Sequence, residues 1–403
     1  MGQSLPMKNR DYILFLTGLF TSKFAYFMMV VAVNWQLYQL TKSPLSLGLL
    51  GLFNFIPILL MSFFSGIIAD IFNRKKILFL VIFFSMLNSL TLAVLTTKGL
   101  INPWLIYLLI GLNSAYYSFE APARQSMLPT LVPRKKFPLA VSINNMVFHS
   151  TNFFGPAAAG FIIAYLGVSG VYFINVGIFF AALTSLLFMS PAVRNIVRPK
   201  FNFMEIKQGL SFVFKSPLIF SSMMIDFLAT FFASATTLMP IFAVDILKIG
   251  PAQMGFLYAA PSAGAIVAGL IFTFLHKIKN QGRVLIYSVL LYGAATVFFA
   301  LSRNYYLSLF FIAVAGAADM ISAVIRNIVR QLSTPDHLRG RMTAVNMVFY
   351  NGGPQLGEVE AGFTAHFFGA PASVALGGLA TIAITLYIAK KTPQLLNYKD
   401  KDN

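Results

Sequence analysis

Long apolar segments recur along the whole chain and restrict its fold more than any other feature. Of the 403 residues, 58% are hydrophobic and only 10% are charged, whereas a soluble globular protein carries about 25% charged residues. A helix needs roughly 20 consecutive apolar residues to cross a hydrocarbon core of about 30 Å. Because such segments follow one another with short polar breaks, the sequence predicts an all-α membrane protein.

Twelve membrane-spanning helices are predicted, with turn-forming or charged residues at most of the breaks between them. They cover residues 11–40, 45–71, 77–97, 103–124, 137–166, 168–189, 217–246, 252–275, 283–301, 304–330, 338–367 and 371–390. The longest polar stretch follows the sixth span. It predicts two six-helix bundles, residues 1–190 and 217–403, joined by a cytoplasmic linker over residues 191–216.

The basic residues are distributed unevenly over the predicted loops. The net charge is +18, and 25 of the 30 lysines and arginines fall on one side of the predicted bundle. Membrane proteins keep such an excess in the cytoplasm, so we expect both termini there and no nucleic-acid partner. The chain has no cysteine, which excludes disulfides and thiolate metal sites. The polar N-terminus lacks a cleavage site after an apolar core, so we expect the first span to be retained.

The two predicted halves resemble each other in sequence. Residues 145–148 of the fifth span read Asn-Met-Val-Phe, and residues 346–349 of the eleventh span repeat them. The fourth span ends in Arg124-Gln125, and the tenth ends in Arg330-Gln331. Two matches in the same order predict pseudo-symmetric bundles.

Polar residues follow one helix face in the fourth span and again in the tenth. At spacings i, i+4, i+7 and i+11, the fourth-span stripe consists of Asn113, Tyr117, Glu120 and Arg124. The tenth-span stripe lies 206 positions later and consists of Asp319, Ala323, Arg326 and Arg330. An ionisable group in a span is costly unless it meets a partner or a cavity. We therefore expect both stripes to line a substrate or proton path, facing each other or bound substrate.

Other polar residues lie deep in the spans and are candidates for the same path. They are Lys23 in the first span, His149 in the fifth, Asp226 in the seventh, and Gln355 and Glu358 in the eleventh. Glu360 is two positions beyond Glu358, about 200° around the helix. The two carboxylates therefore do not share one narrow pocket.

Structural roles are the alternative for several of these residues. Glu120 and Arg124, four positions apart, could form only an intrahelical pair. Arg326 and Arg330 could end their helix and anchor it at the membrane surface, and His149 could be an interhelical hydrogen-bonding group.

The segment over residues 66–76, between the second and third spans, resembles the loop signature G-x-L-x-D-R-x-G-R-K of the major facilitator superfamily. The matching positions are Gly66, Asp70, Arg74 and Lys75, while Ile71 and Asn73 replace an arginine and a glycine. The resemblance implies the major facilitator fold and a charge latch between its halves at the cytoplasmic face. Glu120 is a candidate partner for the arginine of that latch.

The fifth span resembles the end of the antiporter signature of the same superfamily. Gly155, Pro156 and Gly160 match it, and Ser142, Thr151 and Ala159 replace three of its glycines. These replacements are small, so close helix packing is still expected.

Over nearly its whole length the sequence resembles the branch of the superfamily that contains the enterobactin exporter and proton-coupled drug efflux pumps. Residues 69–76, 252–260 and 334–341 carry this resemblance. It implies a monomeric antiporter in the bacterial inner membrane that works by alternating access. The proton gradient would drive export of a siderophore or another amphipathic small molecule, which is the basis of multidrug resistance in this branch, and no cofactor is expected.

Two other functions fit the same predicted fold. One is import of a siderophore or metabolite, and the other is a membrane receptor or scaffold that does not transport. An enzyme is not expected, because the sequence has no nucleotide-binding loop, no Ser-His-Asp arrangement and no cluster of metal ligands.

Overall fold

The computed structural model describes residues 10–190, 203–234, 236–274 and 279–399. Within helices, the side chains of residues 63, 66, 67, 69, 70, 203–207, 273 and 274 lie outside this description. Every regular element in the described part of the chain is a helix or a single helical turn, and no strand occurs there. The all-α architecture is confirmed.

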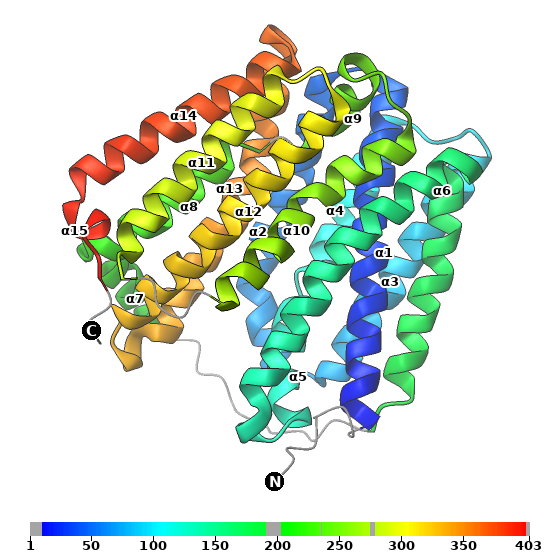
Figure 1. Cartoon of the computed structure of the whole chain (residues 1–403). Coiled ribbons are helices and arrows are strands. Elements are labelled where there is room, and N and C mark those ends of the chain that lie inside the picture. Colours follow the sequence, from blue (N-terminus) through cyan, green and yellow to red (C-terminus); the bar gives the residue numbers. More distant parts are fainter. Residues whose placement is uncertain (1–9, 191–202, 235, 275–278, 400–403) are drawn as a thin grey trace. The chain divides into compact units, whose positions relative to one another are not determined.

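Within each of the two halves of the chain, most helices follow one another with short connections (Figure 1). In the first half of the chain they are α1 (Arg10–Thr41), α2 (Pro44–Ile71), α3 (Arg74–Thr97), α4 (Pro103–Tyr117), α5 (Glu120–Leu131) and α6 (Phe137–Leu187). In the second half they are α7 (Phe203–Lys215), α8 (Pro217–Phe232), α9 (Met239–Ile241), α10 (Pro251–Phe274), α11 (Gln281–Leu301), α12 (Tyr305–Leu332), α13 (Arg339–Phe368), α14 (Ala370–Lys391) and α15 (Pro393–Leu396).

Nine helical segments in the described residues are long and apolar enough to cross a membrane. One of them, α6, holds the predicted fifth and sixth spans together. Its path is interrupted at Gly167, where φ is 72° and ψ is 179°. A positive φ is strained for residues with a side chain and easy for glycine, so Gly167 separates the two spans as predicted.

The predicted fourth span, residues 103–124, is not one continuous helix. It divides into α4 and α5 around a turn at Ser118 and Phe119. Pro122 has no N–H to donate to the carbonyl of Ser118, and its ring disfavours a straight helix at that point. The second piece continues to Leu131, so Arg124 lies within α5 and not at the end of a span.

The predicted seventh span also changes its helical form partway. After α8 the chain continues through a 3-10 turn at Thr236–Leu238, the short helix α9 and a π-helical segment, Phe242–Ile246. Pro240 lies at the start of α9, where its missing N–H is tolerated because a new helical turn begins there.

The described residues group into two compact units. Unit 1 takes in residues 10–42, 53–190 and 250–259, and unit 2 takes in residues 43–52, 203–249 and 260–399. The first turns of α2 and of α10 thus each belong to a unit different from the rest of their helix. The division into bundles 1–190 and 217–403 with a linker between them stays a prediction.

Unit 1 is centred on α6, which packs along α1 and α3 (Figure 1). Its core consists of aliphatic and aromatic residues from these helices and α5, including Phe15, Leu78, Met127 and Phe179. Asn175 of α6 donates to the carbonyl oxygen of Ala25 at 3.0 Å, so the core includes a satisfied polar link.

Unit 2 packs α11 against α12 and α14, and α13 against α8. Ile225, Val289, Val329 and Ile388 contribute to its apolar core. Glycines allow the backbones of α10 and α12 to meet, because a side chain on Gly316 would collide with the carbonyl oxygen of Pro261. Helices in lipid associate largely through such close packing.

This contact predicts opposite effects for two glycine-to-alanine substitutions. Gly316→Ala should lower the free energy of unfolding by about 1–3 kcal/mol, because overpacking forces the helices apart. Gly177→Ala in α6, where an added Cβ has no atom within 4 Å, should leave it unchanged or raise it by up to about 1 kcal/mol through helix propensity. Denaturant unfolding in mixed micelles measures both, and equal effects of the two variants would contradict the contact.

Candidate functional site

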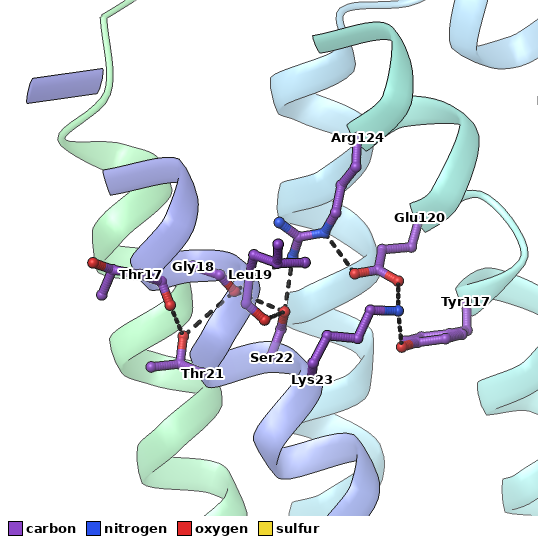
Figure 2. A network of polar contacts seen from close by, with 9 residues as sticks. All are labelled: Thr17, Gly18, Leu19, Thr21, Ser22, Lys23, Tyr117, Glu120 and Arg124. Atoms are coloured by element: carbon purple, nitrogen blue, oxygen red, sulfur yellow. Dashed lines mark hydrogen bonds and ion pairs between the residues drawn. The ribbon is translucent and has the colours of Figure 1, made fainter. Parts of the chain in front are cut away.

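A buried ion-pair cluster joins α1 to α5 in unit 1 (Figure 2). Lys23 Nζ lies 2.6 Å from Glu120 Oε2, and Arg124 Nε lies 2.6 Å from Glu120 Oε1. The Glu120 side chain is 2% exposed and that of Lys23 is 15% exposed. Lys23 Nζ also donates to the Tyr117 hydroxyl at 2.6 Å. Each oxygen of one buried carboxylate therefore binds a different cation.

Arg124 extends this cluster back to the α1 backbone. Its Nη2 donates to Ser22 Oγ at 2.8 Å and to the Gly18 carbonyl oxygen at 3.4 Å, as Figure 2 shows for Ser22. The intrahelical pair of Glu120 and Arg124 is present, but it is only part of a network that holds two helices together.

A second buried cluster joins α8 to α12 in unit 2. Asp226 Oδ1 lies 2.8 Å from Arg326 Nη2, and Asp226 Oδ2 lies 3.8 Å from Arg330 Nη1. Arg326 Nη2 also lies 3.3 Å from Asp319 Oδ1. The Asp226, Arg326 and Arg330 side chains are at most 8% exposed, whereas Asp319 is 45% exposed.

These contacts decide between the alternative roles of two arginines. Arg326 and Arg330 are not surface anchors, because both are buried and paired with Asp226, although Arg330 lies in the last turn of α12. The stripe of unit 1 meets Lys23 of α1, and the stripe of unit 2 meets Asp226 of α8. A buried charge is costly without a counter-charge nearby, and α1 and α8 each supply one.

The two clusters lie on equivalent predicted spans of the two halves with their charges exchanged. The first predicted span of each half supplies the cation Lys23 in unit 1 and the anion Asp226 in unit 2. The fourth span supplies the anion Glu120, and 206 positions later its counterpart is the cation Arg326. The equivalent pairs of helices, α1 with α5 and α8 with α12, are therefore held by ion pairs of opposite polarity.

The polar candidates Asn113 and His149 do not join either cluster. Asn113 is buried in α4, and its Oδ1 has no hydrogen-bond partner in the described part of the chain. His149 is half-buried and contacts the ring of Phe148 edge-on, with centroids 5.7 Å apart.

The candidates of α13 also lie apart from the two clusters. Gln355 Oε1 is buried without a hydrogen-bond donor among the described residues. Glu358 is half-buried, and its carboxyl group forms neither a hydrogen bond nor an ion pair with any described residue. Glu360 accepts a hydrogen bond from Thr364 at 2.8 Å.

The basic end of the loop motif binds backbone carbonyls within unit 1. Arg74 Nη1 donates to the Ser126 carbonyl oxygen at 2.7 Å, and Lys75 Nζ donates to that of Met189 at 2.6 Å. Asn73, where the signature has glycine, caps α3 by accepting from the Lys75 N–H at 3.0 Å.

No contact of the acidic end of the motif is described, since Gly66 and the Asp70 side chain lie outside the described part of the structure. Glu120 is bonded to Lys23 and Arg124, so the expected pair between Arg74 and Glu120 is absent from the described contacts. The latch itself stays a prediction.

The antiporter-like motif brings α6 close to two other helices. A Cβ on Gly155 would lie 2.9 Å from Phe27 Cβ of α1, and one on Gly160 would lie 2.9 Å from Gly255 Cα of α10. Pro156 between them is buried. The expected close packing of this helix is thus present at both glycines.

An apolar pocket of about 520 Å³ lies beside this motif in unit 1. Its lining residues come from α1, α6 and the first turns of α10, and are Phe20, Phe24, Phe153, Phe154, Ala157, Ala158, Phe161 and Phe256. The sequence did not single out these phenylalanines, because 42 occur in the chain and most helices carry several. Spacing on one helix face was the local signal available, since Phe20 and Phe24 are four apart and Phe154 and Phe161 are seven apart.

The fold of this chain is similar to that of solved transporter structures. The crystal structure of a D-xylose-proton symporter is similar with a TM-score of 0.73, at 14% identity, covering 96% of this chain and 99% of the symporter. A bacterial homologue of the human lysosomal transporter Spinster, in an inward-facing and unoccupied conformation, also gives a TM-score of 0.73 at 14% identity, covering 96% of both chains. The predicted major facilitator fold is confirmed.

The family follows from the sequence comparison. Residues 3–402 match the transmembrane secretion effector family, and the chain belongs to this family of major facilitator transporters. Its members are transporters and not enzymes.

Two curated relatives align with most of the chain. The multidrug efflux pump Tap of Mycolicibacterium fortuitum is 25% identical, covering 88% of this chain and 89% of the pump. The enterobactin exporter EntS of Salmonella typhimurium is 24% identical, covering 92% of this chain and 90% of the exporter. A third relative, the uncharacterized MFS-type transporter YfiS of Bacillus subtilis, is 28% identical, with the match spanning 64% of this chain and 60% of that protein.

The buried clusters predict unequal effects for two aspartate substitutions. Asp226→Asn leaves Arg326 and Arg330 without their shared anion, so it should lower the free energy of unfolding by about 3–5 kcal/mol. Asp336→Asn removes an ion pair with Arg339 in which the aspartate is 89% exposed. This substitution should change the free energy of unfolding by no more than about 0.5 kcal/mol. Denaturant unfolding in mixed micelles compares them, and similar small effects would contradict a buried, stabilising role for Asp226.

Proposed function

We propose that this protein is a secondary active transporter that uses the proton gradient to export a siderophore or a similarly amphipathic small molecule. It would work by alternating access. The observation that carries this proposal is the pair of buried charge clusters, one around Glu120 and one around Asp226.

Charged groups inside membrane spans are retained mainly where they serve a path for substrate or ions. Glu120 is shared by two cations and Asp226 by two arginines. Loss or gain of a proton or of an anionic ligand would release one partner from the shared carboxylate. Such clusters can exchange partners in a transport cycle at less cost than an isolated ion pair, because the remaining partner still compensates the charge.

The apolar pocket of unit 1 supports an amphipathic cargo. About 520 Å³ lined by six phenylalanines and two alanines is within the usual size range of small-molecule sites. The polar cluster around Lys23 lies on the same helix, one position from Phe24 of the pocket. The names of the relatives Tap and EntS point to drug and enterobactin export.

We further propose that the protein is a monomer in the bacterial inner membrane with both termini in the cytoplasm. Its partners would be the cargo, protons and the lipid bilayer, with no nucleic acid and no cofactor. The excess of lysine and arginine in the predicted cytoplasmic loops supports this orientation.

The loop over residues 66–75 is proposed to act as a latch between the halves. Asp70→Asn should then lower transport while expression and membrane insertion stay unchanged, because an acid near a helix N-terminus or a basic residue is lost. Lys42→Gln, which changes a charge in a loop outside the motif, is the control. Transport at the wild-type rate in Asp70→Asn would remove the latch from the proposal.

Everted membrane vesicles test the direction and the coupling together. Respiration acidifies their interior, so a proton-coupled exporter should accumulate ethidium or enterobactin inside, and nigericin should abolish the accumulation. An importer that moves protons and cargo together would instead empty preloaded vesicles. A receptor or scaffold would produce no movement linked to the gradient, and that outcome would overturn the proposal.

Substitutions in the unit 1 cluster give a residue-level test. Glu120→Gln should reduce gradient-driven accumulation by at least about tenfold, since it removes the only anion that Lys23 and Arg124 share in the described cluster. Asp336→Asn, an exposed aspartate, should transport like the wild type. Uptake rates normalised to the amount of folded protein distinguish the two, and equal rates would separate the cluster from transport.

A further inference from the structure

Glu358 differs from the other carboxylates that lie within the helices of unit 2 and unit 1. Glu120, Asp226 and Asp319 each lie within 3.3 Å of a lysine or arginine nitrogen, and Glu360 is hydrogen bonded to Thr364. Glu358 has no such partner among the described residues. The charged form of a carboxyl group in apolar surroundings is costly without a counter-charge, so the ionisation of Glu358 is less compensated than that of these four carboxyl groups.

The helix around Glu358 is in close contact with the start of α2, within unit 2. A Cβ on Gly51 would lie 2.9 Å from Glu358 Cβ, and one on Gly48 would lie 3.1 Å from the Glu358 carbonyl oxygen. Gly362, one turn further along α13, packs directly on Gly48. The carboxyl group of Glu358 therefore sits beside a tight contact between two backbones, where there is little room for a hydrated ion.

The surfaces packed around this position supply no charge. Residues 44–52 of α2, 227–232 of α8, 236–238 of the 3-10 turn and 370–386 of α14 contain no titratable side chain. Asp226 is engaged with its arginines. The helix α7 meets α13 near Arg341, 17 positions from Glu358 or about 25 Å along the helix. On α13 itself, Tyr350 and His366 are both eight positions, about 12 Å, away.

Gln355 provides a second and independent observation. Its Oε1 is buried and accepts no hydrogen bond from any described residue. Residues three apart on a helix are neighbours on its surface, so Gln355 and Glu358 lie on one face. An ionised carboxylate can only accept hydrogen bonds, whereas a protonated carboxyl has one O–H to donate. The donor that Gln355 lacks is thus what a proton on Glu358 would provide.

We propose that Glu358 takes up and releases the coupled proton, and that its protonated form donates to Gln355 Oε1 and permits the close contact between α2 and α13. Release of the proton leaves a carboxylate that has no cation and an amide oxygen that has no donor. Both costs are relieved when α2 and α13 separate and water reaches the pair. The inference rests on the proposed proton coupling for its role in transport, but the protonation site itself does not depend on the cargo.

Infrared difference spectroscopy tests the protonation site without a cargo. Purified wild-type protein in nanodiscs should show a carboxylic acid C=O band that disappears as the pH is raised. Glu358→Gln should lack that band, while Glu360→Gln on the same helix should retain it. A band unchanged in Glu358→Gln, or lost only in Glu360→Gln, would overturn the assignment.

Spin-label distances test the link to the helix contact. The chain has no cysteine, so the pair Leu45→Cys and Phe367→Cys can be labelled without removing any native thiol. The distance between the labels should lengthen with rising pH in the otherwise wild-type chain. It should stay short in Glu358→Gln, whose amide N–H₂ replaces the protonated acid as a donor. The same pH response with and without Glu358→Gln would overturn the proposed link.

Transport assays separate this inference from the proposed function. Glu358→Gln should lose ethidium accumulation driven by the pH gradient but keep exchange of ethidium across the membrane without a gradient, and Glu360→Gln should keep both. If the wild type shows no gradient-driven movement while the infrared band still depends on Glu358, the export proposal fails and the protonation site stands. If the wild type transports and Glu358→Gln is fully coupled, the export proposal stands and this inference is wrong.

Discussion

The need to compensate charge inside a lipid-embedded helical bundle governs the structure of both units. Glu120 is buried in unit 1 because Lys23 and Arg124 each take one of its oxygens, and Asp226 is buried in unit 2 because two arginines surround it. Removing one partner would leave an uncompensated charge at a cost of several kcal/mol. These clusters therefore tie α1 to α5 in unit 1 and α8 to α12 in unit 2.

Close backbone contact is the second requirement, since lipid offers little hydrophobic drive for helices to associate. Gly155 lets α6 approach α1, Gly160 meets Gly255 of α10, and Gly316 lets α12 approach α10. These contacts bring the apolar pocket and the antiporter-like motif of α6 together in unit 1. Packing and charge compensation thus act together on α1 and α12.

The exchange of polarity between the clusters has a physical explanation. Equivalent helices are joined by an ion pair in both units. The attraction is the same whichever helix carries the cation, apart from local hydrogen bonds. The described cluster of unit 1 has two cations for one anion, whereas that of unit 2 has two of each. The described cluster of unit 1 therefore carries one more cation than anions, whereas that of unit 2 is balanced.

Composition and spacing by themselves determined that the chain is an all-α protein embedded in lipid. They also determined most span positions and the residues worth examining. Apolar length, the loop charges and the stripes at 206-residue spacing are local properties that hydropathy and helix periodicity express directly. They also identified Lys23, Glu120, Asp226 and Arg326 as candidates. The tertiary structure decided which of these meet, because partners 97 or 100 positions apart in the chain are brought together only by packing. It also decided the breaks near Pro122 and Pro240, where a missing N–H competes with a long apolar run, and the isolation of Glu358, which depends on what its neighbouring helices lack.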